Sequence, residues 1–146
     1  MNLFGVLDIS GSALVAERQR AEVVASNLAN ADTTRTAAGG PYRRQHVVFA
    51  AAAPFAEELG MQMASFADFS LRGVRVQQVV EDTAPPLRRF DPSHPDADAE
   101  GYVSSPAVNP IEEMVNLMGA SRAYEINVSA IQATKNMIVS ALEIGS

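Results

Sequence analysis

The 146-residue chain contains no cysteine, no tryptophan, one lysine and only two histidines. Without cysteine it can form no disulfide and no zinc–thiolate site, and it has no thiolate nucleophile. His46 and His94 are too few to build a usual zinc site, which takes three or four ligands. We interpret both as surface or packing residues, and we expect no metal ion and no cofactor.

Positive charge is also scarce, and it is spread along the chain. The net charge is −6, and most arginines occur in separate pairs rather than on one basic face, so we expect no nucleic-acid partner. No uninterrupted apolar run of about 18 residues is present, which predicts no membrane span. The N-terminus lacks a basic segment before its apolar residues and carries Asp8 early. It makes a poor secretory signal, so export from the cytoplasm would need another route.

Sequence motifs for catalysis are missing as well. The chain has no G-x-x-x-x-G-K-[ST] loop, no G-x-G-x-x-G turn and no G-x-S-x-G element. Gly39 and Gly40 are followed by Pro41, which lacks the backbone amide that a phosphate-binding nest would use. We therefore expect that the chain is not an enzyme.

The acidic segment at residues 96–101, DADAEG, is similar to the start of an EF-hand loop. Position twelve would be Ala107, where a bidentate glutamate is required, and Pro92 and Pro95 occupy the place of the preceding helix. We interpret the segment as an acidic, solvated turn. A calcium- or metal-dependent enzyme is the alternative, and a calcium titration would decide between the two.

Helical sequence is abundant at both ends of the chain. In residues 109–146, apolar residues recur at alternating steps of three and four, which predicts a long helix that faces a partner helix along one stripe. Asn109 can cap this helix, Pro110 suits its first turn, and Glu112 and Glu113 suit the positive end of its dipole. The expected stripe consists of Met114, Leu117, Ser121, Tyr124, Val128, Ile131, Lys135, Ile138 and Leu142.

The same helix carries a second apolar set outside that stripe, and a helix that is apolar nearly all round must be buried nearly all round. One partner helix covers one stripe, so we expect neighbouring subunits to cover the rest. The alternative is the central helix of a monomeric bundle. Arg122 and Glu125, three residues apart, can pair across the helix surface. The second apolar set consists of Ile111, Val115, Met118, Ile126, Met137, Val139 and Ile144.

Residues 1–30 form the other predicted helix, which is rich in glycine and alanine and can approach a partner closely. Asn30 is expected to end it, because a turn-rich segment follows. Its stripe has the same spacing as the stripe of the C-terminal helix and consists of Leu7, Gly11, Leu14, Arg18, Ala21, Ala25 and Leu28.

The middle of the chain is predicted to contain strands. Residues 42–49 and 73–82 are rich in β-branched or aromatic types. Residues 87–90 are expected to return as the hairpin partner of 73–82, and residues 91–106 form an extended loop that leads to the C-terminal helix. Residues 50–70 mix helix formers with proline and glycine, which indicates a variable connector that can contain a short helix.

These patterns predict an α+β fold that is mostly α. Two long terminal helices pair as an antiparallel coiled coil, with a small β-hairpin region between them. The expected divisions are an N-terminal helix at 1–32, a β-rich region with its connector and extended loop at 33–107, and a C-terminal helix at 108–146.

Several stretches also resemble a known family. Residues 25–33, ASNLANADT, resemble the S-x-N-L-A-N-x-x-T signature near the N-terminus of bacterial flagellar rod and hook proteins. Residues 109–114, NPIEEM, and 122–127, RAYEIN, resemble the C-terminal signature of that family. The middle of the chain is similar to proteins of the proximal rod at residues 40–44, 73–76 and 91–103.

The resemblance implies a structural subunit of the proximal rod of the flagellar basal body, exported by the flagellar type III apparatus without a cleaved signal peptide and located in the periplasmic space. It implies a helical assembly that transmits torque, with the terminal helices in a coiled-coil inner layer. The implied partners are other rod proteins, copies of the chain, components at the base of the rod and the export apparatus. The alternatives are another rod or hook subunit and, from a different class, a soluble helical adaptor or export chaperone.

Subunit contacts are therefore expected along both helices. Tyr124 and Asn127 are expected in buried contacts between helices. Asn27 and Asn30 are expected to satisfy backbone groups at the end of the N-terminal helix, or to bond a neighbour. The predicted contact residues are Leu7, Leu14, Asn27, Leu28, Asn30, Met114, Leu117, Tyr124, Asn127, Val128, Ile131, Ile138 and Leu142.

Overall fold

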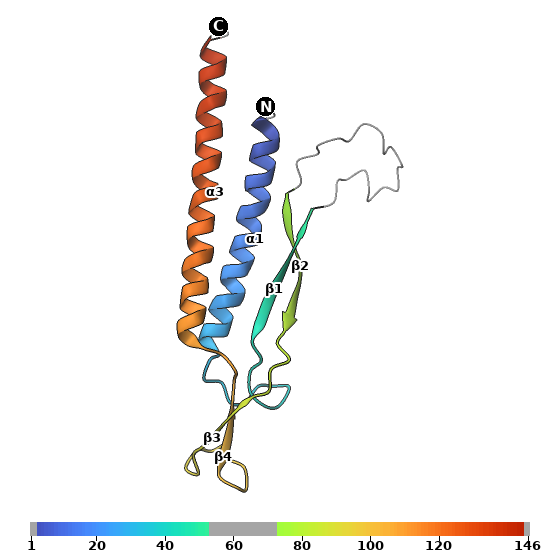
Figure 1. Ribbon diagram of the computed structural model, residues 1–146, viewed down its shortest axis with the longest axis vertical. Coiled ribbons are helices and arrows are strands. Elements are labelled where there is room, and N and C mark those ends of the chain that lie inside the picture. The colour runs from blue at the N-terminus through green and yellow to red at the C-terminus, as the bar shows by residue number, and fades with distance from the viewer. Residues whose placement is uncertain (1–2, 53–72, 145–146) are drawn as a thin grey trace, which may run out of the picture.

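A computed structural model of the chain describes residues 3–52 and 73–144 (Figure 1). Most of the connector expected at residues 50–70 lies outside the described residues. The described elements follow the predicted order of helix, strands and helix. They are α1 (Leu3–Ala29), β1 (Gln45–Ala51), β2 (Val74–Glu81), β3 (Leu87–Phe90), β4 (Tyr102–Ser105) and α3 (Pro110–Ile144).

The two helices run antiparallel along most of the length of an elongated molecule, as Figure 1 shows. Asn109 caps α3 as predicted, because its Oδ1 accepts a hydrogen bond from the Ile111 amide at 3.1 Å. Asn30 follows the last residue of α1, and its backbone amide donates a hydrogen bond to the Ser26 carbonyl at 3.1 Å. The predicted fold class, two long terminal helices with a small β region between them, is confirmed.

The face of α3 that meets α1 differs from the predicted stripe. The buried residues of α3 are Glu113, Ala120 and Thr134, each one residue before a predicted member. Leu117, Val128, Ile131 and Ile138 of the predicted stripe are partly buried. The prediction was wrong for the exposed members, which are Met114, Ser121, Tyr124, Lys135 and Leu142.

The contact face of α3 mixes small and large side chains. A helix that is apolar nearly all round has no single stripe that hydrophobicity can select. Ala120 and Thr134 are small enough to let α3 approach the small-residue helix α1, and partly buried leucine, valine and isoleucine side chains pack beside them.

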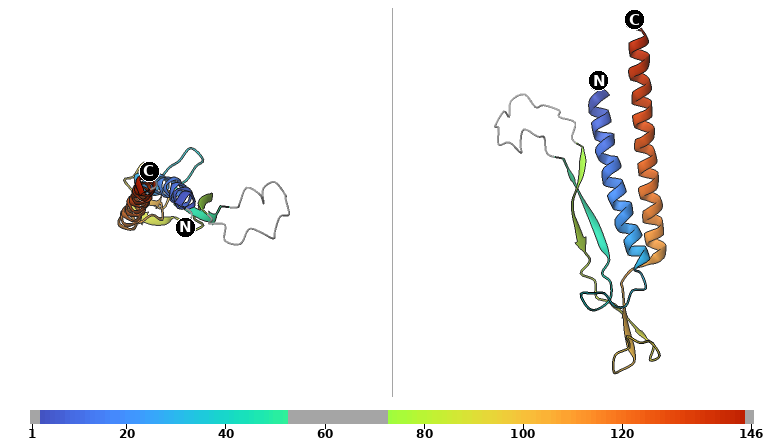
Figure 2. Two further views of the ribbon diagram at one scale, coloured as in Figure 1. Left: turned by 90° about the horizontal axis from the view of Figure 1, so that it is seen from above. Right: turned by 180° about the vertical axis from the view of Figure 1, so that it is seen from behind.

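Helix α1 lies between α3 and the β1–β2 hairpin, and the view from above in Figure 2 shows this arrangement. Ser12 on α1 fixes the start of β2, because its Oγ accepts a hydrogen bond from the Val74 amide at 3.1 Å. Gly73 is required at this approach, since a Cβ atom there would lie 2.4 Å from the Ser12 Oγ.

The pairing of the strands corrects one prediction. β1 pairs antiparallel with β2, from Gln45 opposite Glu81 to Ala51 opposite Val74, with a register shift between Val48 and Phe49. We expected residues 87–90 to return as the partner of β2, but they do not pair with it.

Strand β3 instead pairs with β4, which lies within the segment that was expected to be an extended loop. Pro85 and Pro86 lie between β2 and β3, and proline cannot donate to a sheet ladder, so the chain leaves the first hairpin there. The β3–β4 hairpin extends from the end of the molecule opposite the C-terminus (Figure 1).

Candidate functional site

A buried polar cluster joins both helices to the first strand. Asn27, in the last turn of α1, is 1% exposed and uses all four of its hydrogen-bonding positions. Its Nδ2 donates to the Gln45 carbonyl at 2.8 Å and to Glu113 Oε2 at 2.9 Å. Its Oδ1 accepts from the Gln45 amide at 2.9 Å and from the Tyr42 hydroxyl at 3.0 Å. One side chain therefore holds α1, β1 and α3 together.

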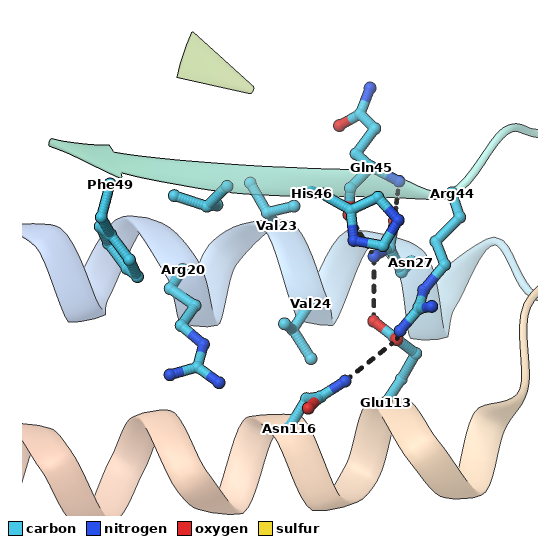
Figure 3. Close-up of a pocket in the computed structure, with 11 residues that line it drawn as sticks. Arg20, Val23, Val24, Asn27, Arg44, Gln45, His46, Phe49, Glu113 and Asn116 are labelled. Atoms are coloured by element: carbon cyan, nitrogen blue, oxygen red, sulfur yellow. Dashed lines mark hydrogen bonds and ion pairs between the residues drawn. The ribbon is translucent and has the colours of Figure 1, made fainter. Parts of the chain in front are cut away.

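Glu113 lies in the first turn of α3, is also 1% exposed, and forms the other half of this cluster. Its Oε1 accepts a hydrogen bond from Arg44 Nε at 2.9 Å and a second, short one from Arg44 Nη2. The same guanidinium reaches Glu112 Oε1 at 3.0 Å. Figure 3 shows Asn27, Arg44 and Glu113 converging between the strand and the two helices.

The charge of Arg44 is stabilised at this position. Burial by itself would lower the pKa of its guanidinium, but the hydrogen bond and the charge of Glu113, followed by those of Glu112, raise that pKa above its usual value. A buried carboxylate must be paired to be tolerated, and Arg44 supplies both the charge and the forked donors that Glu113 requires.

We name the set of Asn27, Tyr42, Arg44 and Glu113 the junction. From the sequence we expected Asn27 near the end of the first helix, with its side chain bonded to backbone groups there or to a neighbour. In the structure its side-chain amide donates hydrogen bonds to β1 and α3. The sequence pattern suggested for Glu113 only an interaction with the helix dipole, and it suggested no role for Arg44. Asn27 and Glu113 belong to the two terminal signatures, and this shared feature could have indicated that the two residues meet, as they do in the junction.

The other predicted contact residues lie along both helices. Asn30 satisfies a backbone group as expected, because its Nδ2 donates to the Ser26 carbonyl at 2.9 Å. Asn127 is partly buried and donates to the Ala123 carbonyl of its own helix at 2.9 Å. Within one copy, Met114, Tyr124 and Leu142 are exposed, whereas partial burial applies to Leu7, Leu14, Leu28, Leu117, Val128, Ile131 and Ile138.

Large apolar side chains cover the outer surface of α3. Met118 is 71% exposed and Ile144 is 88% exposed, and the other members of the second apolar set are exposed as well. Among the described residues, no ion pair joins Arg122 and Glu125, so the pair predicted there does not form in one copy. We call the exposed residues Ile111, Met114, Val115, Met118, Ile126, Met137, Val139, Leu142 and Ile144 the outer face.

The acidic turn at residues 96–101 bonds to its own chain. Asp96 Oδ2 accepts from the Thr34 hydroxyl at 2.8 Å, and Asp98 Oδ1 accepts from the Tyr102 amide at 2.8 Å and from the Glu100 amide at 2.9 Å. The hydrogen bond from the Tyr102 amide is the main reason that the pKa of Asp98 lies below its usual value.

The described residues contain neither a metal-binding cluster nor a membrane-spanning helix. Within residues 3–52 and 73–144, no three histidine or acidic side chains gather closely enough to hold a metal ion. No helix in the same ranges combines the length and the hydropathy that crossing a membrane requires.

An open groove lies between β1 and α3, next to the junction, and α1 forms its floor (Figure 3). Its volume is about 380 Å³. Val24 and Phe49 give it an apolar part, and Asn116 lies on the α3 side. Arg20 enters the groove from α1. His46 borders it on the β1 side, and its Nε2 lies 3.3 Å from Asp82 Oδ2.

Comparisons with known proteins agree with the terminal signatures. Residues 7–35 match the family model of the flagella basal body rod protein. Residues 99–144 match the model of the flagellar basal body rod FlgEFG protein C-terminal region. The two matched segments contain most of α1 and all of α3, and they include Asn27 and Glu113.

Full-length relatives are similar over nearly the whole chain. The flagellar basal-body rod protein FlgC of Bacillus subtilis is 45% identical, and the match covers 99% of each chain. FlgC of Escherichia coli O6:H1 is 43% identical with the same coverage, and FlgC of Borreliella burgdorferi is 41% identical over 99% of this chain and 98% of its own. This similarity extends to the middle of the chain, so it distinguishes the subtype, and it assigns the chain to the flagellar basal body with other rod components. The chain belongs to the FlgC family of flagellar basal-body rod proteins and is a structural subunit of the rod.

Proposed function

We propose that the chain is built into the periplasmic part of the proximal rod as one unit of a helical array that transmits torque. In this proposal the paired helices α1 and α3 form an inner layer with the helices of neighbouring copies and of other rod proteins. The chain acts mechanically and catalyses no reaction. It reaches its place through the flagellar type III apparatus without a cleaved signal peptide and meets components at the base of the rod.

The observation that carries the proposal is the outer face of α3. Isolated exposed apolar residues are ordinary, but large contiguous apolar patches on a protein surface mark sites of interaction. Ile111, Met114, Val115 and Met118 follow the spacing i, i+3, i+4, i+7, which presents one apolar strip to a partner helix. Met137, Leu142 and Ile144 continue the apolar surface at the far end of the helix.

The predicted contact residues enter this proposal in two groups. The exposed ones, Met114, Tyr124 and Leu142, would contact neighbouring subunits directly. The partly buried ones would act by fixing the α1–α3 pair that presents the outer face, and this group contains Leu7, Leu14, Leu28, Leu117, Val128, Ile131 and Ile138.

The decisive experiment is to purify flagellar basal bodies from the bacterium that makes this chain and to probe them for it. We expect it to co-fractionate with other rod proteins and to be released only when the rod dissociates. Finding the chain only as a soluble cytoplasmic species would overturn the proposal and favour the adaptor or chaperone alternative. Fusing the chain to a tightly folded domain tests the export route, since the fusion should remain in the cytoplasm.

A further inference from the structure

The groove beside the junction contains an arginine whose hydrogen-bonding capacity is unused. Arg20 has a side chain 34% exposed, and its Nη1 lies 3.5 Å from Glu17 Oε2. Among the described residues it makes no hydrogen bond, although a guanidinium carries five donors in a fork that suits a carboxylate. Arg20 forms an i,i+3 ion pair with Glu17, and the Glu113 carboxylate at the groove is buried and committed to Arg44 and Asn27.

The rest of the groove is suited to an apolar side chain. Phe49 is 38% exposed on the β1 side, and Val24 lies on the α1 floor. A matching occupant would therefore offer a large apolar group and an unpaired carboxylate on one face of a helix, in the manner of helix-in-groove recognition.

The N-terminal half of α1 offers that combination on its exposed side. Phe4 is 74% exposed and Val15 is 61% exposed. Asp8 lies one turn after Phe4 and about two turns before Val15, so the three residues share one side of the helix. Asp8 is exposed, and within the described chain its side chain has no partner. We name Phe4, Asp8 and Val15 the leading strip.

We propose that the groove of one copy receives the leading strip of a second copy, with Phe4 beside Phe49 and the Asp8 carboxylate on the Arg20 guanidinium. This contact rests on the proposed function, because it supplies one of the copy-to-copy contacts of the rod. The exposed centre of the outer face of α3 carries Arg122 as well as Glu125. In contrast, no cation lies one turn before or after Asp8 on α1, so the leading strip is the better match for Arg20.

The geometry of α1 allows this contact to repeat. At about 100° per residue, the leading strip and the groove side of α1, which carries Arg20, Val24 and Asn27, point in roughly opposite directions. One copy can therefore donate its strip and receive another at the same time. Such a contact between two different surfaces is heterologous, so it propagates from copy to copy as a ring or an open helical array rather than closing as a two-fold dimer.

Charge reversal tests the contact in whole cells. Asp8→Lys and Arg20→Glu are each expected to lower incorporation into basal bodies about tenfold, because each places like charges together. The double variant restores opposite charges and is expected to recover incorporation to within about twofold of the unmodified chain. Asp8 and Arg20 are about three turns apart within one copy, so this recovery cannot come from a bond inside the chain. Asp32→Lys, the same change of an exposed carboxylate outside the leading strip, the groove and the outer face, is the matched control and is expected to incorporate normally.

Normal incorporation of both single variants, or a double variant no better than the worse single one, would overturn the contact. A defect in Asp32→Lys as large as that of Asp8→Lys would also overturn it, because the effect would not be specific to the strip. These results leave the proposed function standing as long as the unmodified chain is found in basal bodies. Absence of the unmodified chain from basal bodies would instead refute the proposed function.

A crosslinking experiment gives an answer that does not depend on folding defects. The chain has no native cysteine, so Phe4→Cys and Phe49→Cys variants produced together can form only crosslinks between the introduced thiols. Both positions are exposed in one copy. Oxidation of isolated basal bodies is expected to give mainly the mixed product, in which the thiol introduced by Phe4→Cys in one copy is joined to the thiol introduced by Phe49→Cys in another. Only like-with-like products, or none, would contradict the proposal.

Discussion

The junction and the outer face of α3 reverse the usual distribution of residue types. At the junction, Asn27 and Glu113 are almost completely buried, although amides and carboxylates are usually exposed. On the outer face, Met118 and Ile144 are mostly exposed, although such residues usually form cores. Within residues 3–52 and 73–144, the buried hydrophobic residues are all alanine or valine, namely Ala16, Val24, Val103, Val108 and Ala120.

This difference indicates a division of labour between the two regions. Polar bonds at the junction specify one arrangement of α1, β1 and α3, because a buried amide and carboxylate have few alternative partners. The large apolar side chains remain on the surface of one chain, and the assembly that we propose would bury them. Polar contacts therefore specify how the elements of one chain meet, and hydrophobic contacts would stabilise the proposed assembly.

The largest expected effect comes from breaking the junction. Glu113→Gln leaves the Arg44 guanidinium, 17% exposed, without its main counter-charge, and breaking a buried pair in this way costs about 3–5 kcal/mol of unfolding free energy. Chemical denaturation of the purified chain measures the loss. The control is Glu112→Gln, since Glu112 is 56% exposed and its pairing contributes no more than about 1 kcal/mol. Equal losses for the two variants would contradict the central role of Glu113.

A smaller loss is expected at the other half of the junction. Asn27→Ala removes four hydrogen bonds and leaves buried groups of Gln45 and Glu113 unpaired, which costs about 1–3 kcal/mol or more. Asn30→Ala removes bonds that are local to the end of α1 and should cost less. Amide exchange near Gln45 should become faster in the Asn27 variant. If Asn30→Ala loosens β1 equally, the junction is not what holds that strand.

A pH titration examines a third polar site, in the exposed β3–β4 hairpin. The folded pKa of Asp98 is lowered, mainly by the Tyr102 amide, so its stabilising contribution is fully present above the ordinary Asp pKa of about 3.9. That contribution is lost as the pH falls from there through the lower folded value. Chemical shifts of residues 98–102 should therefore change at a pH below the ordinary Asp pKa of about 3.9. Asp98→Asn should remove this step, and its persistence would assign the step to another carboxylate.

The outer face should show the smallest effect on stability and a large effect on assembly. Met118→Lys replaces a side chain that is 71% exposed, so the unfolding free energy should change by no more than about 0.5 kcal/mol. Incorporation into basal bodies should nevertheless fall strongly, because a lysine would be buried against a neighbour. Gln132→Lys, at an exposed polar position of the same helix, is the control. A destabilised but normally incorporated Met118 variant would reverse the roles that we assign to the two regions.

The sequence by itself determined the two helices, most of the strand positions and the caps at Asn109 and Asn30. These features depend on local periodicity and on backbone capping, which neighbouring residues encode. The terminal signatures also identified the flagellar rod and hook family, which the full-length relatives then confirmed. The surplus of apolar surface on α3 was likewise visible from composition, because one partner helix cannot cover a helix that is apolar on every side.

Tertiary structure alone decided which face of α3 meets α1, which strand pairs with β3, and how Arg44 and Glu113 pair. The first depended on how the small side chains of Ala120 and Thr134 combine with larger ones on the contact face, which hydrophobicity alone does not select. The second depended on the direction in which the chain leaves Pro85 and Pro86. The third joins residues 69 positions apart in the sequence, and no local pattern specifies such a partner, since only the folded backbone brings the two side chains within hydrogen-bonding distance.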